Sequence, residues 1–122
     1  HGTTLIDAAV AKIVGLPGMI DSGNVFRTTG NAHDDWLGNG SSVNAEWTME
    51  WNPSGDMRYA MEAADKCGVF CNEKRFLWHN GTEFVVGEFE SGLHLFDCDV
   101  IGRGETPALA ICLAILALHG DK

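Results

Sequence analysis

The residues best suited to catalysis are His33, Asp34 and Asp35, which stand beside Trp36 in a stretch rich in glycine and asparagine. A histidine next to a carboxylate can act as a general base or bind a metal ion. Adjacent residues of a loop do not all point at one atom, however, and the same residues also suit a solvated turn. The sequence therefore leaves two hypotheses for this segment, an ordinary turn and a small hydrolase that uses His33 with Asp35.

A second candidate site lies in residues 102–106, Gly-Arg-Gly-Glu-Thr, directly before the last predicted helix. Backbone amides at a helix N-terminus, with Arg103 beside them, would suit an anion such as the phosphate of a small nucleotide. Glu105 would repel that anion, and Thr106 also fits a plain N-cap. Two interpretations stay open here, a helix cap and an anion site.

Aromatic residues could line a pocket for a planar ligand. Trp47 and Trp51 share one face of an alternating run over residues 43–51, which fits either a surface platform or core packing. The serines lack a nucleophile-elbow context, and we assign no catalytic residue and no cofactor. The residues that we assign as candidates for ligand binding are Trp47, Trp51, Arg103, Thr106, His33 and Trp36.

The four cysteines are Cys67, Cys71, Cys98 and Cys112. Two disulfides would allow three pairings. Cys112 lies in an apolar helical run and Cys98 in a strand-like run, however, where free cysteines behave as small hydrophobic residues. A zinc site built from Cys67, Cys71 and His79 would have the wrong ligand spacing. We therefore predict reduced thiols and no metal.

The composition describes a small globular domain with excess negative charge. The chain has 122 residues, of which 45% are hydrophobic and 20% are charged, and its formal net charge is −9. Only eight residues are Lys or Arg, so we expect no binding to DNA, RNA or an anionic membrane. No apolar run reaches the roughly 18 residues of a membrane span, and no secretory signal pattern opens the chain. We expect one cytoplasmic domain over residues 1–122.

Hydrophobic periodicity and turn residues divide the chain into three parts. Residues 3–15 carry an apolar stripe at helical spacing, ended by glycine and proline, which predicts a first helix. Residues 16–51 are rich in Gly and Asn and predict a long loop with a strand at residues 43–51. Residues 52–120 predict a helix over 56–67, an antiparallel meander and a C-terminal helix.

The C-terminal helix has clear signals at both ends. Thr106 is a suitable N-cap, Pro107 suits the first helical position, and Gly120 can adopt the left-handed conformation that ends a helix. Residues 107–118 are apolar on every face. Such a helix is either central in its domain or shared with another subunit, so we expect a homo-oligomer joined through apolar helix surface.

The meander contains Asn80-Gly81, a strong signal for a tight hairpin, and a second turn is expected at residues 90–92. Strands that follow one another, rather than alternating with helices, indicate an antiparallel sheet. The predicted fold is therefore α+β: a three- to four-stranded antiparallel meander sandwiched by helices, with the C-terminal helix buried.

Three segments resemble the phage ABA-sandwich domain, a small helix–sheet–helix family. Residues 5–15 look like its opening helix, residues 52–62 like the entry to its second helix, and residues 104–112 like its terminal helix. The resemblance covers residues 3–15 and 52–119. Residues 16–51 are longer and richer in glycine than the family pattern, and Leu113 stands where the family usually has Arg.

The resemblance implies a phage or prophage origin and the cytoplasm of an infected bacterium, but no established activity or catalytic residue. The leading hypothesis is a non-enzymatic phage accessory protein that binds an unknown host or phage protein or associates with itself. The alternative is a protein that sequesters a small nucleotide signal of bacterial immunity. A small hydrolase that uses the His33 segment is the third hypothesis.

Overall fold

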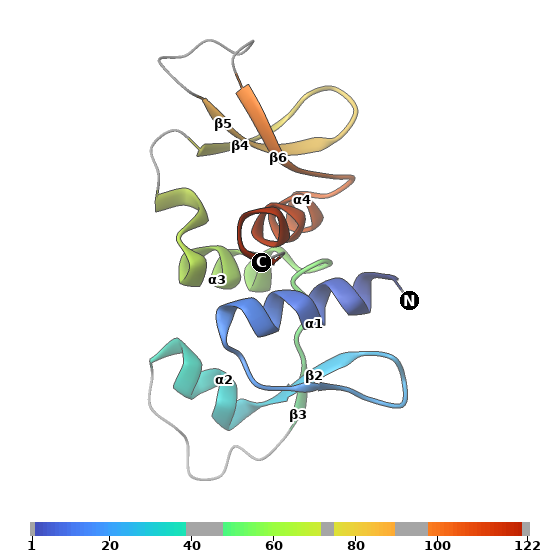
Figure 1. The fold of residues 1–122 in the computed structure, drawn as a ribbon. Coiled ribbons are helices and arrows are strands. Elements are labelled where there is room, and N and C mark those ends of the chain that lie inside the picture. The colour runs from blue at the N-terminus through green and yellow to red at the C-terminus, as the bar shows by residue number, and fades with distance from the viewer. Residues whose placement is uncertain (1, 39–47, 72–74, 90–97, 121–122) are drawn as a thin grey trace.

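The chain has an α+β fold, as predicted, and its computed structural model describes residues 2–38, 48–71, 75–89 and 98–120 (Figure 1). The elements, in chain order, are α1 (Gly2–Val14), β1 (Met19–Ile20), β2 (Phe26–Thr29), α2 (Gly30–Leu37), β3 (Thr48–Glu50), α3 (Met57–Cys67), the 3₁₀ turn η1 (Val69–Cys71), β4 (Arg75–His79), β5 (Phe84–Phe89), β6 (Cys98–Gly104), α4 (Pro107–Ile115) and the π-helical turn η3 (Leu116–Gly120).

The strands form two antiparallel three-stranded sheets. The strands β4, β5 and β6 make the predicted meander, here called the core sheet, and β1, β2 and β3 make a second sheet, here called the edge sheet. Figure 1 shows the core sheet at one end of the molecule and the edge sheet with α2 at the other. Helices α4, α3 and α1 lie between them, so the helical layer is shared by both sheets.

The region predicted as a long loop contains more regular structure than expected. Residues 26–37 form β2 and α2, and Thr48–Glu50, the described end of the predicted strand, pairs with β2. Residues 39–47, including most of that strand, and the expected turn at residues 90–92 lie outside the described residues. The difference arises because short elements with polar surfaces leave little hydrophobic periodicity to detect.

Turn-forming residues at the ends of α2 are in fact helix caps. The hydroxyl of Thr29 accepts a hydrogen bond from the backbone N–H of Ala32, and Gly38 ends the helix with a left-handed φ of 84°. The same signals limit α3, as predicted. There Asp56 accepts from the N–H of Arg58, and Gly68 has a φ of 70°.

Helix α4 is buried in the centre of the domain, as predicted. The Thr106 hydroxyl caps it by accepting from the N–H of Leu109, and Ile111 and Ile115 are fully buried. Strands β5 and β6 pack on one side, and α3 and α1 pack on the other. Because elements of the same chain cover its apolar faces, α4 no longer gives a reason to expect a second subunit. No helix in the described part of the chain is long and apolar enough to span a membrane.

Two glycines set the distance between α4 and the core sheet. A Cβ atom on Gly102 would lie 2.5 Å from the carbonyl oxygen of Ala110 and 2.5 Å from the amide nitrogen of Ala114. A Cβ atom on Gly104 would lie 2.8 Å from the Ala110 nitrogen. The backbone of β6 therefore touches the backbone of α4, and only glycine permits this contact.

Candidate functional site

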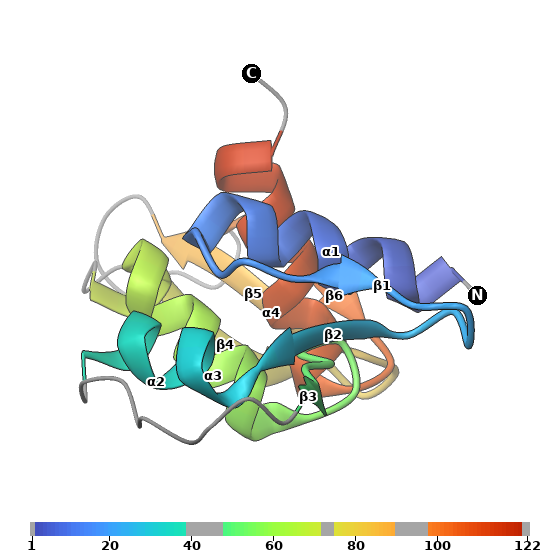
Figure 2. The same cartoon turned by 90° about the horizontal axis from the view of Figure 1, so that it is seen from below.

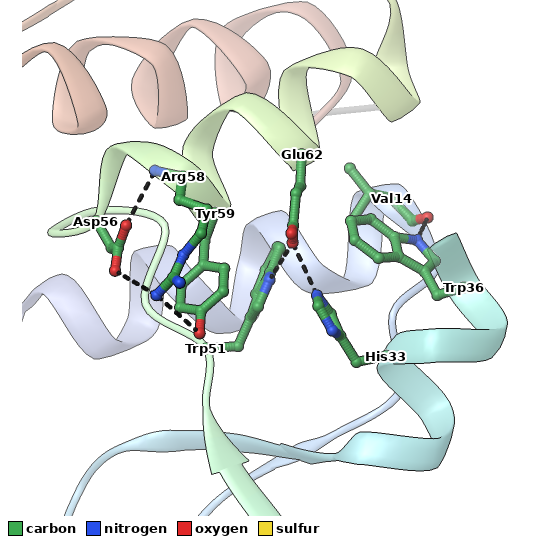
Figure 3. A network of polar contacts seen from close by, with 8 residues as sticks. All are labelled: Val14, His33, Trp36, Trp51, Asp56, Arg58, Tyr59 and Glu62. Atoms are coloured by element: carbon green, nitrogen blue, oxygen red, sulfur yellow. Dashed lines mark hydrogen bonds and ion pairs between the residues drawn. The ribbon is translucent and has the colours of Figure 1, made fainter. Parts of the chain in front are cut away.

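His33 lies on α2, and its partner is a carboxylate from a distant part of the chain. Its Nε2 is 2.8 Å from Oε1 of Glu62 on α3, and the two side chains are 12% and 19% exposed. The same Glu62 oxygen accepts a hydrogen bond of 3.3 Å from Nε1 of Trp51. Figure 3 shows Glu62 between the two donors. Asp35, the expected partner of His33, is exposed.

Aromatic rings enclose the His33 side chain. Its ring centroid lies 5.9 Å from that of Trp36 and 6.1 Å from that of Tyr59. Trp36 in turn donates from Nε1 to the carbonyl oxygen of Val14 on α1, and the Lys66 ammonium lies 5.2 Å from a Trp36 ring centroid. This network joins α2 to α1 and α3 (Figure 3), so both earlier interpretations, a solvated turn and an open catalytic dyad, fit it poorly.

Trp51 belongs to the core. The residue is fully buried, and its ring lies edge-on against those of Phe26 and Trp36, at centroid distances of 6.2 and 5.6 Å. Of the two interpretations of Trp51, core packing is therefore right and a surface platform is wrong, because the Trp51 side chain points inward. Trp47, its expected companion, lies outside the described residues.

Arg103 and Thr106 lie near the core sheet, apart from the His33 network. The Arg103 side chain is 60% exposed, and its Nη1 lies 3.5 Å from Oε2 of Glu83 on the neighbouring hairpin. The Thr106 hydroxyl serves as the α4 cap. The structure thus brings His33, Trp36 and Trp51 together but gives Arg103 and Thr106 structural partners of their own.

Cys67, Cys71 and Cys112 are free thiols, and the side chain of Cys98, the fourth cysteine of that prediction, lies outside the described residues. Burial raises the pKa of the Cys67 thiol and, more strongly, that of the Cys112 thiol. Both thiols therefore remain protonated and unreactive at neutral pH. Within the described ranges, no group of three or more His, Cys, Asp or Glu side chains is placed to hold a metal ion.

The sequence did not predict a hollow beside the edge sheet that is lined by residues of α1 and of β1. Figure 2 shows β1 beside α1. This helix-side hollow has a volume of about 480 Å³. Small and apolar side chains form most of it, and Lys12 is its single charged residue. The lining residues are Ala8, Ala11, Lys12, Gly15, Leu16, Pro17, Gly18, Met19, Ile20 and Phe26.

A second hollow lies at the same strand. This outer hollow has a volume of about 440 Å³ and is lined by Pro17, Gly18, Met19, Asp21, Arg27, Thr28, Thr29, Ala32 and Thr48. The two hollows share residues 17–19, so together they form one groove around β1, here called the edge groove. Met19, which lines both hollows, is 70% exposed.

The two hollows differ in charge. Lys12 is exposed and has no ion-pair partner among the residues that the structure describes. Arg27 of the outer hollow is paired with Asp21, and its hydrogen bond to that carboxylate lowers the Asp21 pKa. The helix-side hollow therefore has a cation available to a ligand, whereas the cation of the outer hollow is neutralised.

One sequence signal marks the edge groove. Residues 17–20, Pro-Gly-Met-Ile, are a short apolar run between turn residues. Apolar side chains in such a run pack either against their own domain or against a partner. The sequence could not show that β1 is only two residues long and leaves space beside α1.

Comparison with known proteins gives no further information on this site, because no protein family, no characterised protein and no solved structure matches this chain.

Proposed function

We propose that this chain is a non-enzymatic binding protein, an accessory protein of a phage or prophage in the bacterial cytoplasm, that holds its ligand in the edge groove. The observation that supports the proposal is the groove itself. Each hollow falls within the roughly 300–1,000 Å³ of ligand sites. The helix-side hollow is lined mainly by apolar side chains, and the outer hollow combines apolar surface with polar side chains that could orient a ligand. The phage setting rests on the resemblance of residues 3–15 and 52–119.

A binding role fits better than hydrolysis. A general base must reach its substrate, but His33 is enclosed by rings and directs Nε2 at Glu62. Hydrogen bonds of this kind hold helices together, and here they join α2 to α3.

A different protein is favoured as the partner over a second copy of this chain, because the apolar faces of α4 are already covered within the chain.

A fluorescence titration with the apolar anion 1-anilinonaphthalene-8-sulfonate (ANS) tests the proposal. The naphthalene rings suit the apolar lining, and the sulfonate suits Lys12. We expect the folded protein to bind the dye and Met19→Glu to weaken binding at least tenfold, because the new carboxylate lies between both hollows.

Leu5→Glu is the matched control. Leu5 is 67% exposed on α1 and lines neither hollow, so the same apolar-to-acidic change there should leave dye binding unchanged. Absence of dye binding to the wild-type protein, or equal loss in both variants, would contradict the proposed function.

A further inference from the structure

No strand in the described part of the chain pairs with the second edge of β1, so this open edge offers main-chain hydrogen bonds. The Asp21 N–H donates to the Val25 carbonyl, which places the bonds of Asp21 on the β2 side of the strand. Ile20 pairs with Phe26, and the carbonyl of Phe26 accepts from Trp51 on the β3 side. Because hydrogen-bonded and non-hydrogen-bonded pairs alternate along an antiparallel ladder, the N–H and C=O of Ile20 point away from β2, toward the open edge.

Residues from both faces of this edge line the edge groove. Ile20 and Phe26, a cross-strand pair, line the helix-side hollow, whereas Arg27, the partner of Met19, lines the outer hollow. An extended chain beside β1 would direct successive side chains alternately to the two faces of the sheet. An extended peptide could therefore contact both hollows and the main-chain groups of Ile20 at the same time. A helical ligand could not, because its main-chain groups are already hydrogen-bonded within the helix.

The charges restrict the ligand further. Lys12 is the single charged residue of the helix-side hollow and has no described ion-pair partner, while Arg27 opposite is already paired with Asp21. A carboxylate on the ligand is therefore attracted on the α1 side of the strand, and apolar or small uncharged side chains suit the other positions.

We propose that the ligand is an extended segment of a partner protein that adds to β1 as a further strand and places an acidic side chain against Lys12. This inference rests on the proposed function and names the chemical class of its ligand. Main-chain hydrogen bonds to Ile20 would provide affinity, and the two hollows and Lys12 would provide specificity.

Backbone methylation tests strand addition directly. The probe is the most enriched decapeptide from a displayed random library selected on the wild-type protein, synthesised with N-methyl groups either on its odd-numbered or on its even-numbered residues. A strand directs alternate N–H groups at its neighbour, so one series should lose at least tenfold in affinity while the other stays within about threefold. Equal loss in both series would overturn the proposal.

Hydrogen exchange gives a second measurement. The Ile20 amide should exchange at least tenfold more slowly when the unmethylated peptide is bound, because its N–H then donates to the peptide. Unchanged exchange at Ile20 under saturating peptide would overturn strand addition.

The carboxylate is tested by a mutant cycle. Replacing the acidic residue of the peptide by its amide, or Lys12→Met in the protein, should each weaken binding about five- to tenfold, and the two changes together should weaken it no further. Arg103→Met removes the same charge far from the groove and should have no effect. Additive losses would overturn the pairing with Lys12.

The dye separates this inference from the proposed function. If the protein binds ANS in a way that depends on Met19 but the library yields no peptide with that dependence, the strand inference fails and the binding role stands. If neither the dye nor any peptide binds, both fail.

Discussion

Two helices of this protein present small residues to a sheet, with opposite results. Helix α4 places Ala110 and Ala114 against β6, where a Cβ atom on Gly102 would come within 2.5 Å of helix backbone. Helix α1 places Ala8 and Ala11 toward β1, yet a hollow of about 480 Å³ remains there. Small helix residues alone therefore do not close an interface.

The length of the strands and the glycines of β6 explain why α4 packs closely against its sheet and α1 does not. The core sheet has strands of five, six and seven residues, and β6 crosses α4 with glycines at the points of contact. The edge sheet has strands of two, four and three residues, so it ends before it covers the face of α1. The sheet at one end of the molecule is therefore in contact with its helix, and the sheet at the other end leaves a hollow beside its helix.

The largest effect is expected from Gly102→Ala. The added methyl group would collide with backbone atoms of Ala110 and Ala114, which have no rotamer by which to move away. We expect a loss of about 3 kcal/mol in the free energy of unfolding, measured by urea denaturation. Gly55→Ala is the control, because its nearest neighbour is an Asn52 side-chain atom at 3.4 Å, and it should change stability by less than about 0.5 kcal/mol.

A smaller effect is expected at the edge-sheet end from His33→Ala. The change removes a hydrogen bond to the mostly buried Glu62 carboxylate and loosens α2, which should lower the free energy of unfolding by about 1–3 kcal/mol. His119→Ala, at an exposed position, should have no measurable effect. Unchanged stability in His33→Ala would show that the network does not hold α2 in place.

Asp7 of α1 predicts a dependence on pH. Burial raises the Asp7 pKa above its ordinary value of 3.8, although hydrogen bonds from Ser54 oppose this shift. The folded state then holds a proton that the unfolded chain has lost, so this group adds stability as pH falls through the raised pKa and stops doing so below about 3.8.

Asp7→Asn should remove that pH-dependent contribution while it keeps an acceptor for the N–H of Ser54, 2.9 Å away. Asp7→Ala loses the acceptor and should cost about 1–2 kcal/mol at any pH. Urea denaturation from pH 4 to 7 measures both. A wild-type profile that matches Asp7→Asn at every pH would contradict the assigned shift.

The smallest effect on stability is expected from Ala8→Leu, which most directly tests the contrast between the two helices. The larger side chain enters the helix-side hollow, so stability should change by less than about 0.5 kcal/mol. Ala114→Leu, the equivalent change against β6, should cost about 3 kcal/mol. Similar costs for both variants, measured by urea denaturation, would mean that the hollow is closed in solution.

Much of the fold could be predicted because its signals are local. Thr106 and Pro107 mark the start of α4, and Asp56 and Gly68 limit α3, whatever the rest of the chain does. The hairpin at Asn80-Gly81 is equally local, and Gly81 has the expected left-handed φ of 100°. Helix α2 has local caps in Thr29 and Gly38, but it lacks a clear apolar stripe between them, and its packing depends on contacts of His33 and Trp36 with distant elements.

The edge groove was harder to predict than the fold. Alternation shows which residues share a face of a strand, but not whether that face points inward, and this is why the sequence left both a surface platform and core packing open for Trp51. The edge groove depends on the distance between α1 and β1, which no local pattern encodes. Residues 17–20 reveal only that apolar side chains must be accommodated there.

The central place of α4 also constrains synthesis. Helices α1 and α3 and strand β6 all precede α4 in the chain, yet they pack against it. A ribosome must therefore release residue 115 from its exit tunnel before the core can close. Until then the apolar faces of the earlier elements stay exposed on the nascent chain, where chaperones can bind them. A message truncated before the codon for Pro107 would yield a product for proteolysis rather than a partial domain.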